Sequence, residues 1–185
     1  MSTIIDKKIY SEQEYLLLEE SSLAKHEFIN GELFEMAGTT VLHNEICLKL
    51  FILLFSELNK LGYRVLVENV KLNINHDSQV FLYPDIIVTN EIIGSPNAKF
   101  VTQPILLAEI LSDSTRNYDM TDKFIQYRKI STLQYYITIE PTKQIIYLFE
   151  KSATGEWSTQ LFTELTDIIQ LPLLNISFNL AAIYK

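Results

Sequence analysis

The stretch VFLYPDIIV at residues 80–88, followed by PILLAEIL at residues 104–111, decides the fold class of this chain. Both runs are almost continuously apolar and rich in Val, Ile and Leu, as is typical of strands buried on both faces of a sheet. Pro84 cannot donate a hydrogen bond to a neighbouring strand, so the first run should be interrupted at the Pro84–Asp85 step. We therefore predict two central strands, each of which contains one carboxylate.

These two carboxylates are Asp85 and Glu109. A carboxylate in an apolar strand is costly unless it is paired or bound to a cation. Two of them on neighbouring strands would form the hard oxygen site that Mg²⁺ prefers, with coordination positions left for water and phosphate oxygens. Lys123, on the helix expected after the second strand, could return to the strand end and orient an attacking water or offset phosphate charge.

The segments before these strands predict helices and a hairpin. The run SEQE at residues 11–14 is a capping-box pattern and predicts a short N-terminal helix. HEFI and ELFEM flank Asn30-Gly31, which is the signal for two strands joined by a type I′ turn. Apolar residues recur at the helical period from His43 to Leu61, and Gly62 is placed to end that helix.

The segments after the long helix complete a mixed α/β pattern. Val65 and Val67 occupy odd positions before Glu68-Asn69, whereas the apolar residues after it, from Val70 to Ile74, occupy even positions. Because side chains alternate between the two faces of a strand, this change predicts an extra residue, a bulge or a break, at Glu68-Asn69. A helix is expected from Tyr118 to Lys129, and apolar strands separated by turns predict a C-terminal β-meander. No linker or repeat interrupts residues 1–185, so we expect a single domain in which helices flank a mixed central sheet.

Composition limits the class of protein. A net charge of -8 and a pI near 4.9 argue against nonspecific coating of nucleic acid, although carboxylates around a metal would raise the negative count without facing DNA. Cys47 is the only cysteine, which excludes an internal disulfide and a cysteine-based zinc cluster, and it should be buried. No secretory signal or membrane-spanning run is visible, so a cytoplasmic protein without membrane contact is expected.

A family resemblance rests on YPD at residues 83–85, EILSDST at residues 109–115, and the Asp119, Asp122-Lys123 and Tyr127 that follow. These residues resemble the Uma-two family of restriction endonucleases, part of the PD-(D/E)xK nuclease superfamily. NGE at residues 30–32 and His43 extend the resemblance across nearly the whole chain. The resemblance implies a restriction-endonuclease-like fold and cleavage of DNA that depends on Mg²⁺, for which Mn²⁺ could substitute.

By this resemblance, Asp85, Glu109 and the Ile110 carbonyl would ligate the metal, and Lys123 would be the superfamily lysine. The chain departs from the Glu-x-Lys pattern because Leu111 stands where that lysine normally lies. Lys123 can replace it only if its helix folds back over the strand end.

The resemblance also places three further side chains on the cleft side. Glu32 would complete the acidic site, His43 at a helix start would contact phosphate or water, and Glu27 has the weakest claim. Each candidate also has a plain structural interpretation. Glu109 could be a structural partner of Arg128 or Lys123, and Lys123 could form a solvated i,i+4 pair with Asp119. His43 could make an ordinary helix-terminal hydrogen bond. Glu32 and Glu27 could be solvated hairpin residues. His26 and His76 are expected at the surface.

Three functions follow from these observations. The first is a Mg²⁺-dependent endodeoxyribonuclease, for which a homodimer would suit cleavage of both strands. The alternative is a catalytically inactive restriction-endonuclease-like domain that binds nucleic acid or protein, since fold does not fix function. A third, weaker hypothesis is a metal-dependent hydrolase of a small phosphorylated substrate.

Overall fold

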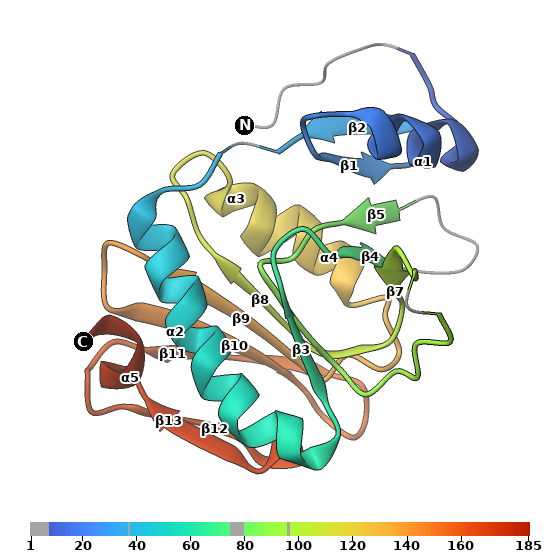
Figure 1. The fold of residues 1–185 in the computed structure, drawn as a ribbon. Helices are drawn as coiled ribbons and strands as arrows, with labels where there is room; N and C mark the ends of the chain where they lie inside the picture. The colour runs from blue at the N-terminus through green and yellow to red at the C-terminus, as the bar shows by residue number, and fades with distance from the viewer. Residues whose placement is uncertain (1–7, 37, 75–79, 96) are drawn as a thin grey trace.

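The computed structural model describes residues 8–36, 38–74, 80–95 and 97–185 (Figure 1). The expectation for His76 lies outside these residues. The helical elements are α1 (Glu12–Ser21), α2 (Val41–Leu58), η1 (Asn59–Leu61), α3 (Arg116–Tyr118), η2 (Asp119–Lys123), α4 (Phe124–Tyr127), η3 (Pro172–Leu174) and α5 (Ala181–Tyr184). The strands are β1 (His26–Ile29), β2 (Glu32–Glu35), β3 (Arg64–Val67), β4 (Lys71–Asn73), β5 (Val80–Leu82), β6 (Ile86–Thr89), β7 (Phe100–Val101), β8 (Pro104–Ile110), β9 (Tyr135–Glu140), β10 (Ile145–Lys151), β11 (Trp157–Phe162), β12 (Ile168–Leu171) and β13 (Ile176–Asn179).

The strands of the described residues form two larger sheets and a hairpin. The central sheet has the order β11-β10-β9-β8-β6-β3, the second sheet has the order β2-β1-β5-β4-β7, and β12 pairs with β13. β8 and β9 are parallel, whereas β6 is antiparallel to β8. The central sheet is therefore mixed, as predicted, and the two apolar runs supply neighbouring strands. The predicted β-meander corresponds to β9, β10 and β11.

One long β-ribbon crosses between the two sheets and is broken in its middle. β3 pairs with β6 in the central sheet through Val67↔Ile86, and β4 pairs with β5 in the second sheet through Leu72↔Leu82. Four residues, 68–71, therefore lie opposite three residues, 83–85. Glu68 and Asn69 both have positive φ, 43° and 58°. The register confirms the extra residue that the change of alternation predicts, and Pro84 explains why the other side of the ribbon is also interrupted.

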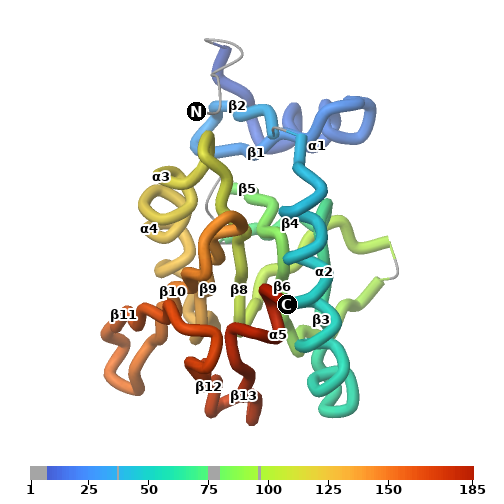
Figure 2. The backbone as a smooth tube through the Cα atoms, turned by 90° about the vertical axis from the view of Figure 1, so that its left-hand side faces the viewer, coloured from blue at the N-terminus to red at the C-terminus, as the bar shows by residue number. Residues whose placement is uncertain are grey.

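Helices cover both faces of the central sheet. Figure 2 shows α2 on one side of β8 and β9, and α3 with α4 on the other. The α2 side has one buried core, which includes Leu50, Leu54 and Ile137, and the α4 side has another, which includes Tyr127 and Tyr136. A smaller aromatic core under α1 holds the second sheet. Successive residues of β8 thus point alternately toward α2 and toward α4.

Local sequence signals explain the ends of the first elements. Ser11 and Glu14 form the predicted capping box of α1. The hairpin turn has φ values of 51° at Asn30 and 95° at Gly31, as a type I′ turn requires. α2 begins after the N-cap Thr40, and the short helix that continues it ends at Gly62, in the left-handed conformation. Cys47 is buried as expected, and no helix within the described residues is long and apolar enough to cross a bilayer.

Candidate active site

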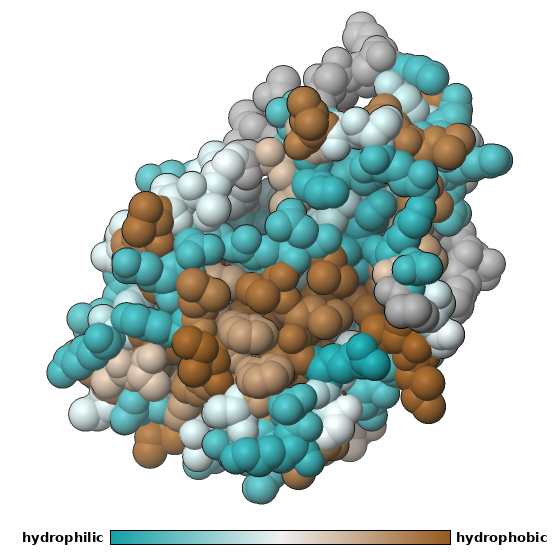
Figure 3. All heavy atoms as spheres, viewed as in Figure 1, coloured by the Kyte–Doolittle hydropathy of each residue, from teal (hydrophilic) through white to brown (hydrophobic). Residues whose placement is uncertain are grey.

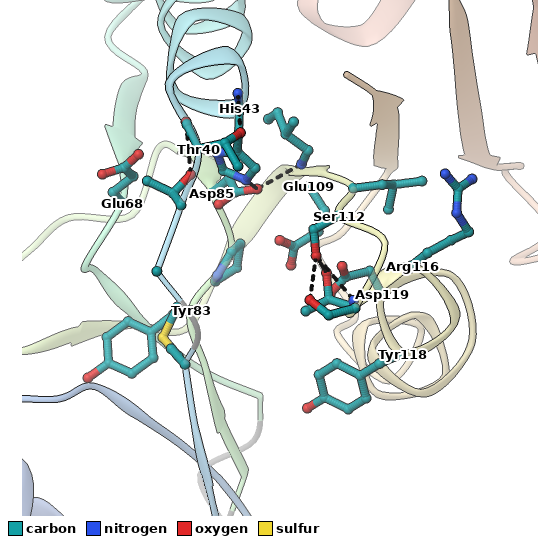
Figure 4. A pocket seen from close by; sticks show the side chains of 18 of the residues that line it. Thr40, His43, Glu68, Tyr83, Asp85, Glu109, Ser112, Arg116, Tyr118 and Asp119 are labelled. Atoms are coloured by element: carbon teal, nitrogen blue, oxygen red, sulfur yellow. Dashed lines mark hydrogen bonds and ion pairs between the residues drawn. The ribbon is translucent and has the colours of Figure 1, made fainter. Parts of the chain in front are cut away.

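A pocket of about 780 Å³ lies where the two sheets meet. Its walls come from the β1–β2 hairpin, the start of α2, the broken ribbon, the end of β8 and the segment that leads into α3 (Figure 4). Of the lining residues that the structure describes, eight are Asp or Glu and three are Lys or Arg. The pocket is therefore strongly acidic, which makes it a place where a cation is electrostatically favoured.

Asp85 enters this pocket at the point where the ribbon breaks. The β6–β8 register pairs Ile86 with Ala108, which sets Asp85 beside Glu109 at the ends of neighbouring strands. Asp85 Oδ2 accepts a hydrogen bond from the Ile110 backbone N–H at 2.7 Å and lies 3.1 Å from His43 Nε2. Burial by itself lowers the pKa of His43, but the hydrogen bond and charge of Asp85 outweigh it, so the pKa is raised. His43 is thus tied to Asp85.

The Glu109 side chain points toward α4 and lines the same pocket as Asp85. Its Oε1 accepts hydrogen bonds from Lys123 Nζ at 3.1 Å and from the Tyr127 hydroxyl at 2.7 Å. Burial raises the pKa of Glu109 well above its usual range; Lys123 opposes this effect, and the charges of Asp119 and Asp85 add to it. Burial and the neighbouring carboxylates therefore disfavour the negative form of Glu109.

Lys123 is a buried cation shared by three carboxylates. Besides Glu109, its Nζ lies 3.1 Å from Glu27 Oε1 and 3.2 Å from Asp119 Oδ1. Burial alone would lower the pKa of Lys123, but the attraction of Glu109 and Glu27 raises it well above its usual value. The helix that carries Lys123 folds back over the end of β8, as it must if Lys123 is to take the place of the lysine that is missing at Leu111. The raised pKa means that Lys123 is positively charged at neutral pH.

A π-helical turn explains how this helix reaches the site. η2, from Asp119 to Lys123, lies between α3 and α4 and turns both Asp119 and Lys123 inward. The alternative of a solvated Asp119–Lys123 pair is therefore wrong: the pair forms, but both side chains are less than a tenth exposed. Arg128 is not the partner of Glu109; its guanidinium lies over the Phe124 ring.

The β1–β2 hairpin contributes Glu27 to the pocket, and Glu32 is not among the described lining residues. Glu27 also accepts hydrogen bonds from the Tyr118 hydroxyl at 2.8 Å and from the Tyr83 backbone N–H at 3.2 Å. Glu32 lies opposite Ile29, at the turn end of the hairpin, two positions further along the strand pair than Glu27. Two strand residues span about 6.6 Å, which carries Glu32 away from Lys123.

Two other positions differ from the sequence interpretation. His26 is buried rather than on the surface, because its Nδ1 lies 3.1 Å from Glu19 Oε2, and Glu19 Oε1 also accepts from the Tyr83 hydroxyl. Glu68 lines the pocket and accepts a hydrogen bond from the Asn44 amide at 3.3 Å, a position that sequence reasoning did not single out. The break in alternation at Glu68 was the available signal.

Comparison with known proteins assigns the family. A model of the Uma2 family, described as "Putative restriction endonuclease", matches residues 12–182. The chain belongs to the Uma2 family. Two relatives from Synechocystis sp. are the uncharacterized protein sll1609, 34% identical over 89% of this chain and 92% of the relative, and the uncharacterized protein slr1290, 31% identical over 95% and 91%.

A solved structure supports the fold of this Uma2 chain. It is a crystal structure from Anabaena variabilis, described as a putative nuclease belonging to DUF820, with a TM-score of 0.79 and 18% identity over 95% of this chain and 97% of that one. The fold is therefore restriction-endonuclease-like, and family membership supports a nuclease-like function.

The donor set of the Uma2 pocket fits a hard divalent cation. Asp85, Glu109 and the Ile110 main chain lie together at the ends of β6 and β8. Within the described residues, no group of three or more His, Cys, Asp or Glu side chains is arranged to hold a metal. Mg²⁺ commonly takes one or two carboxylates and keeps several waters, so this set suits it better than it suits a metal that needs an all-protein cage. Because burial disfavours the charged form of Glu109, a cation bound beside it would stabilise the ionised carboxylate.

Proposed function

We propose that this Uma2 protein is a Mg²⁺-dependent endonuclease that hydrolyses phosphodiester bonds in DNA and accepts Mn²⁺ in place of Mg²⁺. The observation that supports this proposal most strongly is the meeting of Asp85 and Glu109 at the ends of neighbouring strands, in one pocket, with a buried lysine on Glu109. The two carboxylates offer oxygen ligands for a metal, and the lysine adds a fixed positive charge beside them.

Asp85, Glu109 and the Ile110 carbonyl would hold the metal. Within the described residues, the hydrogen bonds and ion pairs of the two carboxylates are made by Asp85 Oδ2 and Glu109 Oε1. Asp85 Oδ1 and Glu109 Oε2 are therefore the oxygens offered to a cation. When bound, the metal would supply Lewis-acid stabilisation of phosphate charge and a lowered pKa for a coordinated water.

Lys123 would act as a fixed positive charge. Its raised pKa means that it does not take a proton from water at neutral pH. An ammonium has three N–H donors, and Glu27, Glu109 and Asp119 are placed to accept all three. We infer that Lys123 opposes the effect of burial on Glu109 and offsets negative charge on the phosphate, because preorganised charges in a water-poor site act strongly.

DNA should bind only together with a divalent cation. The eight acidic lining residues would repel phosphates, and three basic residues cannot neutralise them. Arg116, one of those three, is already in close contact with the buried Glu140. A bound metal would reverse the local sign of the potential where the scissile phosphate must lie.

Plasmid cleavage tests the proposal. Purified protein should nick supercoiled DNA with Mg²⁺ or Mn²⁺ and not with a chelator. Asp85→Asn and Glu109→Gln should each lower the rate by more than about 100-fold, because loss of outer residues around metals already costs 10- to 100-fold. Asp122→Asn is the matched control: Asp122 is exposed, next to Lys123, and should leave the rate unchanged.

The other two hypotheses give different results in the same experiment. A catalytically inactive binding domain would retain DNA on a gel with Mn²⁺ and yield no product. A hydrolase of small phosphorylated substrates would release phosphate from phosphomonoesters and leave the plasmid intact.

A further inference from the structure

Helix α2 is apolar on two opposite sides. One side packs into the core of the central sheet through Ile46, Leu50, Leu54 and Leu58. The opposite side, which we call the outer α2 face, consists of Val41, Leu48, Ile52 and Phe55, and these side chains are 43% to 78% exposed. A surface helix of a globular protein normally carries polar residues on its solvent side. The outer face is therefore unusual for an isolated chain.

The outer α2 face is continuous with further apolar surface. In the view of Figure 3, hydrophobic side chains cover the middle of this helix without a polar interruption. Six of the fourteen exposed large apolar residues in the described part of the chain lie between Val41 and Leu61. Phe51 stacks on Phe55 with ring centroids 5.4 Å apart, which extends the face sideways. Exposed apolar areas of this kind mark interaction sites.

The spacing within the face is that of a helix–helix seam. Val41, Leu48 and Phe55 are seven residues apart, and Ile52 lies four residues after Leu48. This alternation of four and three residues is the repeat with which two helices pack side by side. A second α-helix is thus the partner shape that fits the face.

We propose that this partner is α2 of a second copy of the same chain, packed antiparallel about a two-fold axis near Ile52. In a two-fold dimer the same patch must meet itself, so the axis passes through the middle of the apolar stripe. Glu45 separates Val41 from the rest of the outer α2 face, so the uninterrupted stripe runs from Leu48 to Phe55 and has its middle near Ile52. The interface follows from this surface alone and does not depend on the nuclease proposal.

Charge supports the antiparallel arrangement. Glu45 and Lys60 are both exposed and bracket the stripe almost symmetrically, seven residues before Ile52 and eight after it. Neither forms an ion pair within the described residues. The two-fold axis near Ile52 brings Glu45 of each copy opposite Lys60 of the other, which gives two attractive pairs. A parallel arrangement would instead bring like charges together, which disfavours it.

The dimer should be reversible. One helix pair buries less surface than the roughly 800 Å² per partner of a standard stable interface, so we expect a dissociation constant in the micromolar range. Sedimentation velocity of the full chain, from about 1 to about 200 µM, should show monomers converting to dimers. A wild-type chain that stays monomeric at the highest concentration overturns the proposal.

Matched variants test the surface. Ile52→Glu puts two charges at the axis and should abolish the dimer at every concentration. Ile168→Glu changes a residue of similar exposure on β12, 57% against 63%, and should sediment as the wild type does. Thermal melts check that both variants are folded, as expected for exposed positions. If Ile52→Glu is folded and still dimeric, the outer α2 face is not the interface.

Charge reversal tests the orientation. Glu45→Lys and Lys60→Glu should each weaken dimerisation by about tenfold, because each creates two like-charge contacts. The double variant restores opposite charges and should recover the wild-type dissociation constant. Independent, additive losses in the double variant overturn the antiparallel register.

Discussion

Lys123 is a buried ammonium whose partners come from three different parts of the chain. Glu109 is on a central strand, Asp119 is on the same helix, and Glu27 is on the N-terminal hairpin. Glu27 is held in turn by Tyr118 and by the Tyr83 backbone. Because Glu27 touches Lys123 and neither of the proposed metal-binding carboxylates, we regard it as a positioning residue. Its carboxylate holds the Lys123 ammonium within hydrogen-bond distance of Glu109.

Glu27→Gln separates positioning from metal binding. The amide keeps the shape and removes the charge, so Lys123 loses one of three anchors. We expect kcat for plasmid cleavage to fall about 10- to 100-fold, as for other residues around a metal site. Mn²⁺ affinity, measured by titration calorimetry, should change far less than in Glu109→Gln. An equal loss of metal affinity in the two variants would show instead that Glu27 is a ligand.

The π-helical turn η2 is the element that carries Lys123 into the site. A π turn contains one residue more than an α turn and is frequent at functional sites. Here it places Asp119 and Lys123 on the buried side, whereas Thr121 and Asp122 between them are exposed. The π turn thus directs the Lys123 side chain into the buried site.

Deletion of Asp122 tests this element. Removing one exposed residue should convert the π turn to a regular α turn, in which Asp119 and Lys123 become i,i+3 neighbours instead of i,i+4 neighbours and the lysine is displaced from Glu109. Far-UV circular dichroism should remain close to wild type while cleavage is lost. Asp122→Asn keeps the chain length and is expected to remain active, so the pair distinguishes helix register from side-chain chemistry.

The hairpin turn is the second element with a defined requirement. Gly31 has a φ of 95°, and a Cβ built there would lie 2.6 Å from Ile9 Cγ2, whereas Gly155 has a φ of 86° and open space around its Cβ position. Both alanine variants strain the backbone, at a cost of about 1–3 kcal/mol each. Gly31→Ala should lose more stability in urea unfolding because it also displaces Ile9. Equal losses of unfolding free energy in the two variants would mean that Ile9 moves aside without a cost in stability.

At the scale of the whole molecule, the pocket exists because one β-ribbon passes from the central sheet to the second sheet. The ribbon breaks at Glu68-Asn69 on one side and at Pro84 on the other, and the pocket opens at this junction. Lys123 then connects the two sheets, since Glu109 belongs to the central sheet and Glu27 to the second. Charge at the junction should therefore influence the stability of the entire chain.

Metal binding should raise the unfolding temperature. A ligand that binds only the folded state stabilises it by about 2.7 kcal/mol at a concentration 100 times its dissociation constant. Calorimetric scans with and without Mn²⁺ should show this shift for the wild type and for Asp122→Asn, and no shift for Asp85→Asn. If Mn²⁺ raised the unfolding temperature of Asp85→Asn as much as that of the wild type, the metal would bind somewhere other than the proposed site.

The sequence by itself determined the local features of this protein. The two apolar runs, their single carboxylates, the capping box, the Asn30-Gly31 turn and the break at Glu68-Asn69 follow from residue period and turn chemistry, which act over a few residues. Asp85, Glu109, Ile110, Lys123 and His43 could be named as site candidates for the same reason, with help from the family resemblance.

Only the tertiary structure decided which side chains meet. Glu27 contacts Lys123 across 96 residues of chain, and Glu32 is not among the described pocket-lining residues because it lies further along the same hairpin. The expected continuous helix contains a π turn, and the Asp119–Lys123 pair that was considered as a solvated alternative is buried. These outcomes depend on strand register and on packing between distant segments, neither of which a local pattern encodes.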